Sequence, residues 1–160
     1  MNAFTLFHVV LSLVGIGAGF LVAFGLLLGK PLPVWTATFL STTLLTSITG
    51  FLFPVHHFMP SHAVGILSLI ALALAIYALY ARRLEGAWRS VHVIDAVIAL
   101  YLNFFVLIAQ LFAKVPALKA LAPTQMEAPF KVAQLTALVA FLLLGIFATR
   151  RFRNEQLRTA

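Results

Sequence analysis

The sequence predicts an all-α protein, an integral membrane bundle of five transmembrane helices that forms a single domain over residues 1–160. Hydrophobic residues make up 62% of the chain and charged residues 9%, and the mean hydropathy is +1.06. A water-soluble protein of this size could not cover so much apolar surface. The apolar residues also fall into five runs, near 3–28, 34–53, 62–81, 87–114 and 129–149. Each run is long enough to cross about 30 Å of hydrocarbon as a helix.

The first two runs differ in their polar content. The run 3–28 has no basic segment before it and no small-residue cleavage site, so we expect a retained helix and not a signal peptide. Its Gly15 and Gly19 form a GxxxG pair, which lets a neighbouring helix approach closely. Residues 29–33 break the helix with glycine and prolines. The run 34–53 is rich in hydroxyls, and at helical spacing one face carries Thr38, Thr42, Thr46 and Thr49. These hydroxyls either bond to backbone or neighbouring helices, or line a polar cavity.

The fourth run is the one around which we expect the others to pack. It carries one polar stripe formed by His92, Asp95, Asn103 and Gln110, which fall at steps of three or four residues when Ala99 and Val106 between them are included. A carboxylate at membrane depth is costly to keep ionised, so Asp95 is expected to face protein or water and not lipid. The preceding run ends in tyrosines and arginines that suit a membrane interface.

The fifth run follows the longest loop. Residues 115–121 are expected to form a short interfacial turn, and Thr124 and Glu127 have the spacing of a capping box. Pro129 suits the first turn of a helix, which then runs to a basic tail.

The charges indicate the orientation in the membrane. Five crossings would place eight Lys and Arg residues on one side: Lys30, Arg82, Arg83, Arg89, Arg150, Arg151, Arg153 and Arg158. The other side would carry three, Lys114, Lys119 and Lys131. The positive-inside rule then predicts a cytoplasmic C-terminus and a periplasmic N-terminus. Because the basic residues sit at the ends of apolar runs, the net charge of +7 indicates contact with headgroups and not with nucleic acid.

Four stretches together resemble a family of small bacterial multi-pass membrane proteins to which no activity is assigned. They are GFLFP (50–54), PSHAVGILSL (60–69), DAVIALYLNFFVLIAQ (95–110) and KVPALKALAPTQ (114–125), with the last the most distinctive. The resemblance implies a bacterial inner-membrane protein. It implies no cofactor and no site residue.

Histidines near the outer side form the candidate metal site. His8, His56, His57 and His62 all fall there under the predicted topology. Imidazoles suit copper, zinc, nickel or a haem iron, and His8 with His62 is the pair to consider for haem b. The alternative is that these histidines are simply solvated at the interface. The chain has no cysteine, which excludes thiolate metal sites and disulfides.

The candidate ligand-binding residues are His92, Asp95, Asn103, Gln110 and Gln134. His92 and Asp95 share a helix face, where the pair can act as a proton relay or as a clamp between helices. Gln110 and Gln134 are expected at similar depth, where they can bond to each other or to a ligand such as a quinone carbonyl. No nucleotide loop, paired carboxylates or Ser-His-Asp set is present, so no catalytic residue is assigned.

Three functions remain open from the sequence. The favoured one is a non-enzymatic protein that binds a small ligand, lipid or protein partner within the bundle, either alone or as a homo-oligomer. The second is a redox or metal-handling protein that uses copper, or haem b with a quinone. The third is proton-coupled transport along the fourth helix, for which five helices are few.

Overall fold

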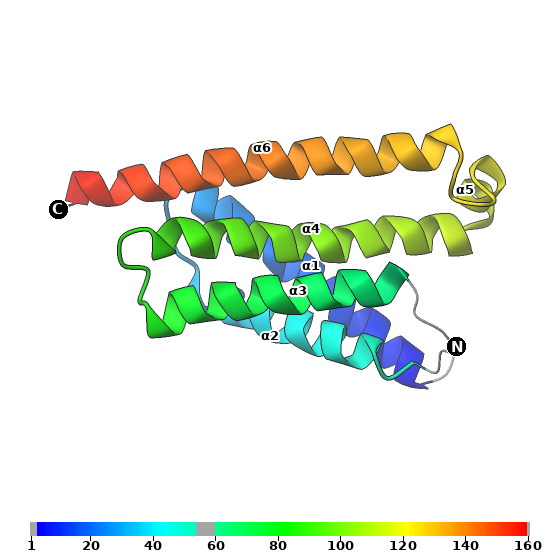
Figure 1. The fold of residues 1–160 in the computed structure, drawn as a ribbon, viewed down its shortest axis with the longest axis horizontal. Helices are drawn as coiled ribbons and strands as arrows, with labels where there is room; N and C mark the ends of the chain where they lie inside the picture. Colours follow the sequence, from blue (N-terminus) through cyan, green and yellow to red (C-terminus); the bar gives the residue numbers. More distant parts are fainter. Residues whose placement is uncertain (1–2, 54–59, 160) are drawn as a thin grey trace.

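In the computed structural model, residues 3–53 and 60–159 are described, with side chains up to residue 152 apart from Pro60. The described part is helical and contains no strand. Its elements are α1 (Ala3–Leu27), α2 (Pro33–Gly50), α3 (Pro60–Ile76), the π-helical turn η1 (Tyr77–Ala81), α4 (Trp88–Lys114), α5 (Pro116–Leu121) and α6 (Ala128–Thr159). The long helices lie roughly along one direction (Figure 1). The predicted all-α class is confirmed.

Within the described residues, four helical stretches are long and apolar enough to cross a membrane, as expected for a multi-pass membrane protein. They are Ala3–Leu27, Ser61–Ala81, Trp88–Lys114 and Ala128–Phe152. The predicted second span, α2, is not among them, because its many hydroxyl side chains lower the hydropathy of an 18-residue helix. The structure therefore establishes four such helices where the sequence predicted five.

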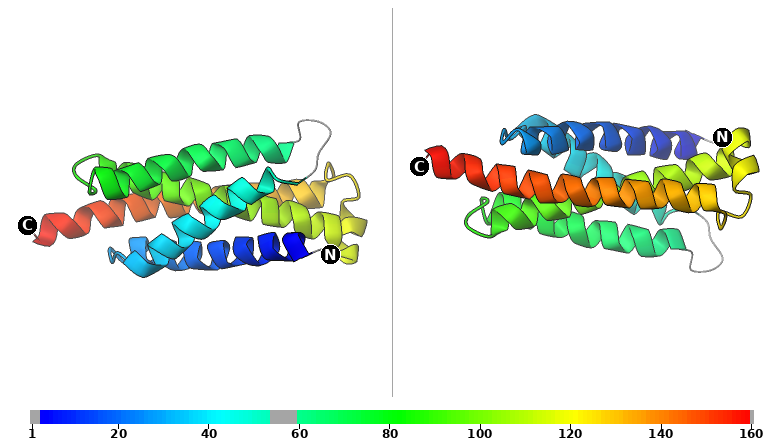
Figure 2. Two further views of the ribbon diagram at one scale, coloured as in Figure 1. Left: turned by 90° about the horizontal axis from the view of Figure 1, so that it is seen from below. Right: turned by 90° about the horizontal axis from the view of Figure 1, so that it is seen from above.

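Helix α4 occupies the centre of the bundle. It contacts α1, α2, α3, α5 and α6, and the views from above and below place it between the other long helices (Figure 2). Its buried face includes His92, Val93, Ala96, Leu100 and Asn103. Small residues at 96 and 99 allow its neighbours to approach, which explains how one helix can contact all the others.

Glycines determine how closely α1 approaches α2 and α4. An ideal Cβ at Gly15 would lie 3.0 Å from Thr43 Oγ1, and one at Gly19 would lie 2.5 Å from Leu100 Cδ1. Both glycines of the GxxxG pair therefore face the helix partners that they allow to come close. The apolar core beside Gly19 includes Phe39 and Leu100, each only 1% exposed.

Two described connections lie at opposite ends of the bundle. After Ile76 the helix widens into η1, and the turn that follows contains Arg83, Leu84 and Gly86 at positive φ (48°, 59° and 53°). At the other end, α5 and α6 pack on α4 through a second small core that contains Ile108 and Phe112.

The loop before α6 contains the predicted Thr124–Glu127 interaction in a modified form. The Thr124 hydroxyl and amide donate to Glu127 Oε1 over 2.8 and 3.2 Å. However, α6 begins at Ala128 and the Lys131 amide donates to the Glu127 carbonyl, so Glu127 is the residue that precedes the helix. The interaction therefore closes the loop, and Thr124 is not the N-cap residue of α6. At its far end α6 continues to Thr159, well beyond the expected end near residue 149.

Candidate functional site

Polar side chains from three helices meet around Gly15: Ser12 of α1, Thr42 and Thr43 of α2, and Asn103 of α4. Together with Thr46, about one turn beyond Thr43 on α2, we call them the polar cluster. The Ser12 hydroxyl of α1 donates to Asn103 Oδ1 of α4 over 3.0 Å. An ideal Cβ at Gly15 would lie 3.1 Å from Thr42 Oγ1 and 3.5 Å from Asn103 Nδ2. The absent side chain at Gly15 thus lets the hydroxyls of α2 and the amide of α4 reach the backbone of α1.

Several polar atoms of this cluster have no hydrogen-bond partner. Thr42 donates to the carbonyl of Thr38 over 2.6 Å, as membrane threonines commonly do. By contrast, Thr43 Oγ1, Thr46 Oγ1 and Asn103 Nδ2 are buried and unpaired within the described part of the chain. Thr43 is 1% exposed and Asn103 is 8% exposed, so bulk solvent does not satisfy them. The cluster therefore offers two hydroxyls and an amide N–H to an additional hydrogen-bonding group.

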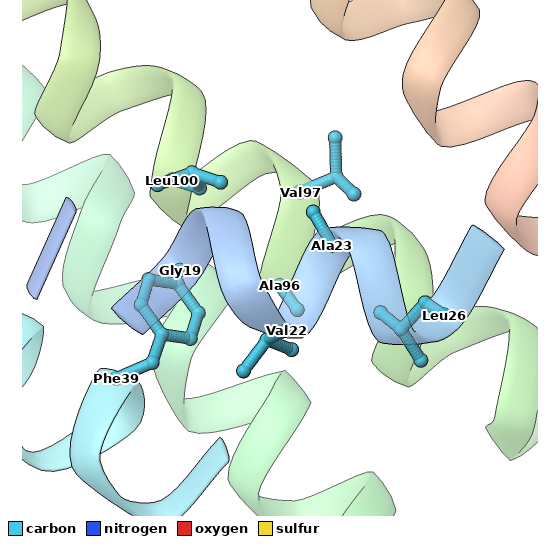
Figure 3. A pocket seen from close by; sticks show the side chains of 8 residues that line it. All are labelled: Gly19, Val22, Ala23, Leu26, Phe39, Ala96, Val97 and Leu100. Carbon is cyan, nitrogen blue, oxygen red and sulfur yellow. The ribbon is translucent and has the colours of Figure 1, made fainter. Parts of the chain in front are cut away.

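The neighbouring crevice is apolar and narrow. It lies on the side of the polar cluster toward Leu26 and is lined by Gly19, Val22, Ala23, Leu26, Phe39, Ala96, Val97 and Leu100 (Figure 3). It has no room for a water molecule. This part of the interior is therefore filled by side chains, and the unpaired atoms of the polar cluster lie outside it.

His92 links α4 to α3 and does not bond to Asp95. Its Nδ1 lies 2.9 Å from the carbonyl oxygen of Ala75, just before η1. Because a carbonyl oxygen only accepts, Nδ1 carries the proton and donates. Asp95 is buried to 9% exposure, and within the described residues its carboxylate makes no hydrogen bond or ion pair. Of the two roles considered for this pair, the structure shows the helix-to-helix clamp for His92 and leaves Asp95 without a partner.

The two glutamines are not joined to each other. Gln134 Nε2 of α6 donates to the carbonyl of Phe105 over 3.1 Å, and its Oε1 is buried and unpaired. Gln110 is exposed near the end of α4. A glutamine that the sequence did not single out, Gln125, donates to the carbonyl of Ala109 over 2.8 Å and fastens the loop to α4.

The histidines proposed as metal ligands are engaged elsewhere or fall outside the described residues. His8 Nδ1 lies 2.8 Å from Thr49 Oγ1, and its ring meets Phe53 edge-on. The ring of His62 stacks on Phe51 at 5.7 Å. His56 and His57 lie in the stretch 54–59, outside the described ranges. Within those ranges, no group of three or more His, Cys, Asp or Glu side chains is placed to hold a metal ion.

Sequence reasoning missed Ser12 and Thr43, which the structure places in the polar cluster. The threonine face chosen from helical spacing included Thr38, yet Thr38 bonds to the carbonyl of Val34 away from the core, while Thr43 is buried. Threonines occur on all sides of α2, so their periodicity does not identify the inner face. The available signal was Gly15, since the hydroxyls that meet a GxxxG face must be on the partner helix. No protein-family model, curated protein or solved structure matches this chain.

Proposed function

We propose that this protein is a non-enzymatic membrane protein that binds a small, neutral, hydrogen-bonding molecule at the polar cluster. The observation that carries the proposal is the pair of unpaired atoms beside Gly15, Thr43 Oγ1 and Asn103 Nδ2, with Thr46 Oγ1 also buried and unpaired about one turn further along α2. A buried polar group without a partner costs about 1–3 kcal/mol, and the hydrocarbon around the bundle supplies no water. An occupant that accepts from the amide and the hydroxyls removes this cost.

The chemistry of the cluster indicates what it binds. None of its five residues is ionisable, so a charged ligand would lack a counter-charge in a low-dielectric site. The amide N–H of Asn103 can only donate, which calls for a carbonyl or ether oxygen on the ligand. A small molecule with such an oxygen, such as a quinone that reaches the cluster from the bilayer, fits this donor set.

We further propose that α2 is the fifth membrane span. Its most exposed large residues are apolar, with Val34 at 75%, Trp35 at 46%, Leu45 at 46% and Ile48 at 45% exposure. The hydroxyls that lower its hydropathy are either buried or bonded to its own carbonyls. A helix of 18 residues is also within the length range for crossing a bilayer. With α2 as a fifth span, the positive-inside rule places the C-terminus in the cytoplasm. The family resemblance favours the bacterial inner membrane as the location.

The test compares Thr43→Val with Thr136→Val, which removes a hydroxyl of the same kind from the exposed face of α6. Both proteins and the wild type are purified in mild detergent, and co-purifying small molecules are extracted and identified by mass spectrometry. We expect one compound to accompany the wild type and Thr136→Val and to be lost from Thr43→Val. Adding this compound back should raise the melting temperature of the wild type but not of Thr43→Val.

A purely structural cluster gives a different result. Valine keeps the shape of threonine and removes an unpaired hydroxyl, so Thr43→Val would then be as stable as the wild type or more stable. The same small-molecule content in all three proteins, together with that stability, would refute ligand binding at the cluster.

Asp95 supports a second candidate, proton transfer through the bundle. A buried carboxyl group at membrane depth without a protein partner is costly and is characteristic of proton-handling sites. In vesicles loaded with a pH-sensitive dye, Asp95→Asn should reduce a protein-dependent proton flux to that of protein-free vesicles. An unchanged flux in Asp95→Asn would remove this candidate.

A further inference from the structure

Five arginines gather at the end of the bundle where η1 leads into α4 and where α6 leaves the bundle. We call Arg82, Arg83, Arg89, Arg150 and Arg151 the arginine cluster. The turn into α4 and the C-terminal part of α6 lie at the same end in every view (Figures 1 and 2). Lys30, in the connection between α1 and α2, adds a further cation at this end.

Aromatic rings hold two of these guanidinium groups in place. Arg82 lies over the indole of Trp88 at 5.3 Å, and Tyr77 meets the same indole edge-on at 5.2 Å. Arg89 lies over the ring of Phe152 at 5.5 Å, which brings it to the seam between α4 and α6. Such stacking fixes the guanidinium plane and leaves its N–H groups to bind an anion.

The acidic residue of the turn itself, Glu85, is exposed and pairs with none of these arginines in the described part of the chain. Within the described ranges none of the five arginines forms an ion pair. Arg89 Nε, beside Phe152, is buried and unpaired, and so is Thr149 Oγ1, one turn before Phe152 on α6. Helix α4 has no acidic residue in its first turn and no side-chain cap, so its partial positive charge adds to that of the arginines.

We propose that the phosphate of an anionic phospholipid binds at the arginine cluster, between the turn into α4 and the end of α6. A lipid and not a soluble phosphate is indicated by what adjoins the cluster. Tyr77 and Tyr80 are 48% and 62% exposed, and on α6 the exposed Ile146 and Phe147 continue toward the bilayer. The arginines thus meet the headgroup, the tyrosines lie at its level, and the apolar faces of the helices take the acyl chains.

The experiment measures lipid binding to the intact purified protein in neutral detergent by native mass spectrometry. The probes are phosphatidylglycerol, phosphatidylcholine with the same acyl chains, and inorganic phosphate. The variant Arg82→Gln/Arg89→Gln is compared with Lys119→Gln/Lys131→Gln, which removes two positive charges from the other end of the bundle. Phosphatidylglycerol should bind the wild type and the lysine variant equally, and each arginine removed should weaken binding about fivefold.

The charge-retaining variant Arg82→Lys/Arg89→Lys guards against loss of folding. Its melting temperature should equal that of the wild type. It should also keep most of the phosphatidylglycerol binding, because the phosphate still meets two cations. Equal weakening in the arginine and lysine variants would show attraction by net charge alone. Equal binding of phosphatidylcholine, or displacement of the lipid by millimolar inorganic phosphate, would also overturn the proposal.

Discussion

Gly19 and Gly17 belong to the same helix, yet only Gly19 is enclosed by other side chains. A Cβ at Gly19 would lie 2.5 Å from Leu100 and 2.9 Å from the ring of Phe39. Both neighbours are 1% exposed and so have little space into which to move. A Cβ at Gly17 would meet no atom within 4 Å. Substitution at Gly19 therefore tests the role of glycine in packing, and substitution at Gly17 tests its effect on helix propensity alone.

We expect Gly19→Ala to destabilise the protein by about 1–3 kcal/mol, since it overfills a closely packed contact. Gly17→Ala should leave stability unchanged or raise it by up to about 1 kcal/mol, because alanine favours the helix. Thermal denaturation in detergent measures both. If the two substitutions change stability equally, α1 does not pack closely against α2 and α4 at Gly19.

Glu127, in the loop before α6, gives a prediction about pH. Partial desolvation raises the pKa of the Glu127 carboxyl group, but hydrogen bonds from the Thr124 hydroxyl and from the amides of Thr124 and Met126 outweigh it. The net pKa of Glu127 lies below that of an ordinary glutamate. Its contribution to stability is therefore complete above the pKa of the unfolded chain, and it is lost as the pH falls through the lower folded value.

We expect Thr124→Ala to raise the pKa of Glu127 toward the ordinary value, because the substitution removes one hydrogen bond to the carboxylate. The pKa is measured by NMR, from the chemical shift of the Glu127 carboxyl carbon as a function of pH. Thr136→Ala, on the exposed face of α6, is the control and should leave the midpoint where it is. An unchanged midpoint in Thr124→Ala would contradict this account of the loop.

At the scale of the element, the end of α3 depends on a side chain from another helix. His92 of α4 donates to the carbonyl of Ala75, next to the π-helical turn η1. A π-helical turn is rare, occurs mostly as a single turn within an α-helix, and is often found at functional sites. The bond from His92 thus fastens the start of η1 to the central helix.

His92→Leu should leave this carbonyl without its partner and cost about 1–3 kcal/mol. Amide hydrogen exchange over Tyr77–Ala81 should become faster in the variant, while exchange in α6 stays as in the wild type. Ile98→Leu, at an exposed position on the same helix, serves as the control. Unchanged exchange in η1 would show that the turn holds without His92.

The polar stripe of α4 shows what helical spacing predicts and what it does not. His92, Asp95 and Asn103 are buried as expected, whereas Gln110 is exposed. Spacing continues one face along the whole helix, but near its end α4 is covered on the side of Ile108 and Phe112, where α5 and α6 pack. The partner of His92 is likewise a main-chain carbonyl, which has no signature in the sequence.

At the scale of the whole molecule, the apolar runs predicted helices well because a backbone in lipid must satisfy its own hydrogen bonds. The number of spans was harder to predict, because hydropathy averages over both faces of a helix. In α2 the hydroxyls are either buried or bonded to carbonyls of their own helix, so the average hydropathy understates how apolar its exposed large residues are.

Whether α2 crosses the membrane can be tested with single cysteines, since the chain contains none of its own. With five spans, Lys30→Cys and Arg83→Cys label from the same side with a membrane-impermeant maleimide, and Lys119→Cys labels from the other. If α2 does not cross, residues 30 and 83 lie on opposite sides. Labelling of intact cells and of inverted vesicles distinguishes the two arrangements.

The central position of α4 has a consequence for biogenesis. The ribosome completes α1, α2 and α3 before α4 emerges, so Ser12 and Thr43 are synthesised before their neighbour Asn103. During that interval these two hydroxyls have no α4 to pack against. Chains that stop before Trp88 should therefore be removed by membrane proteases much faster than chains that stop after Lys114.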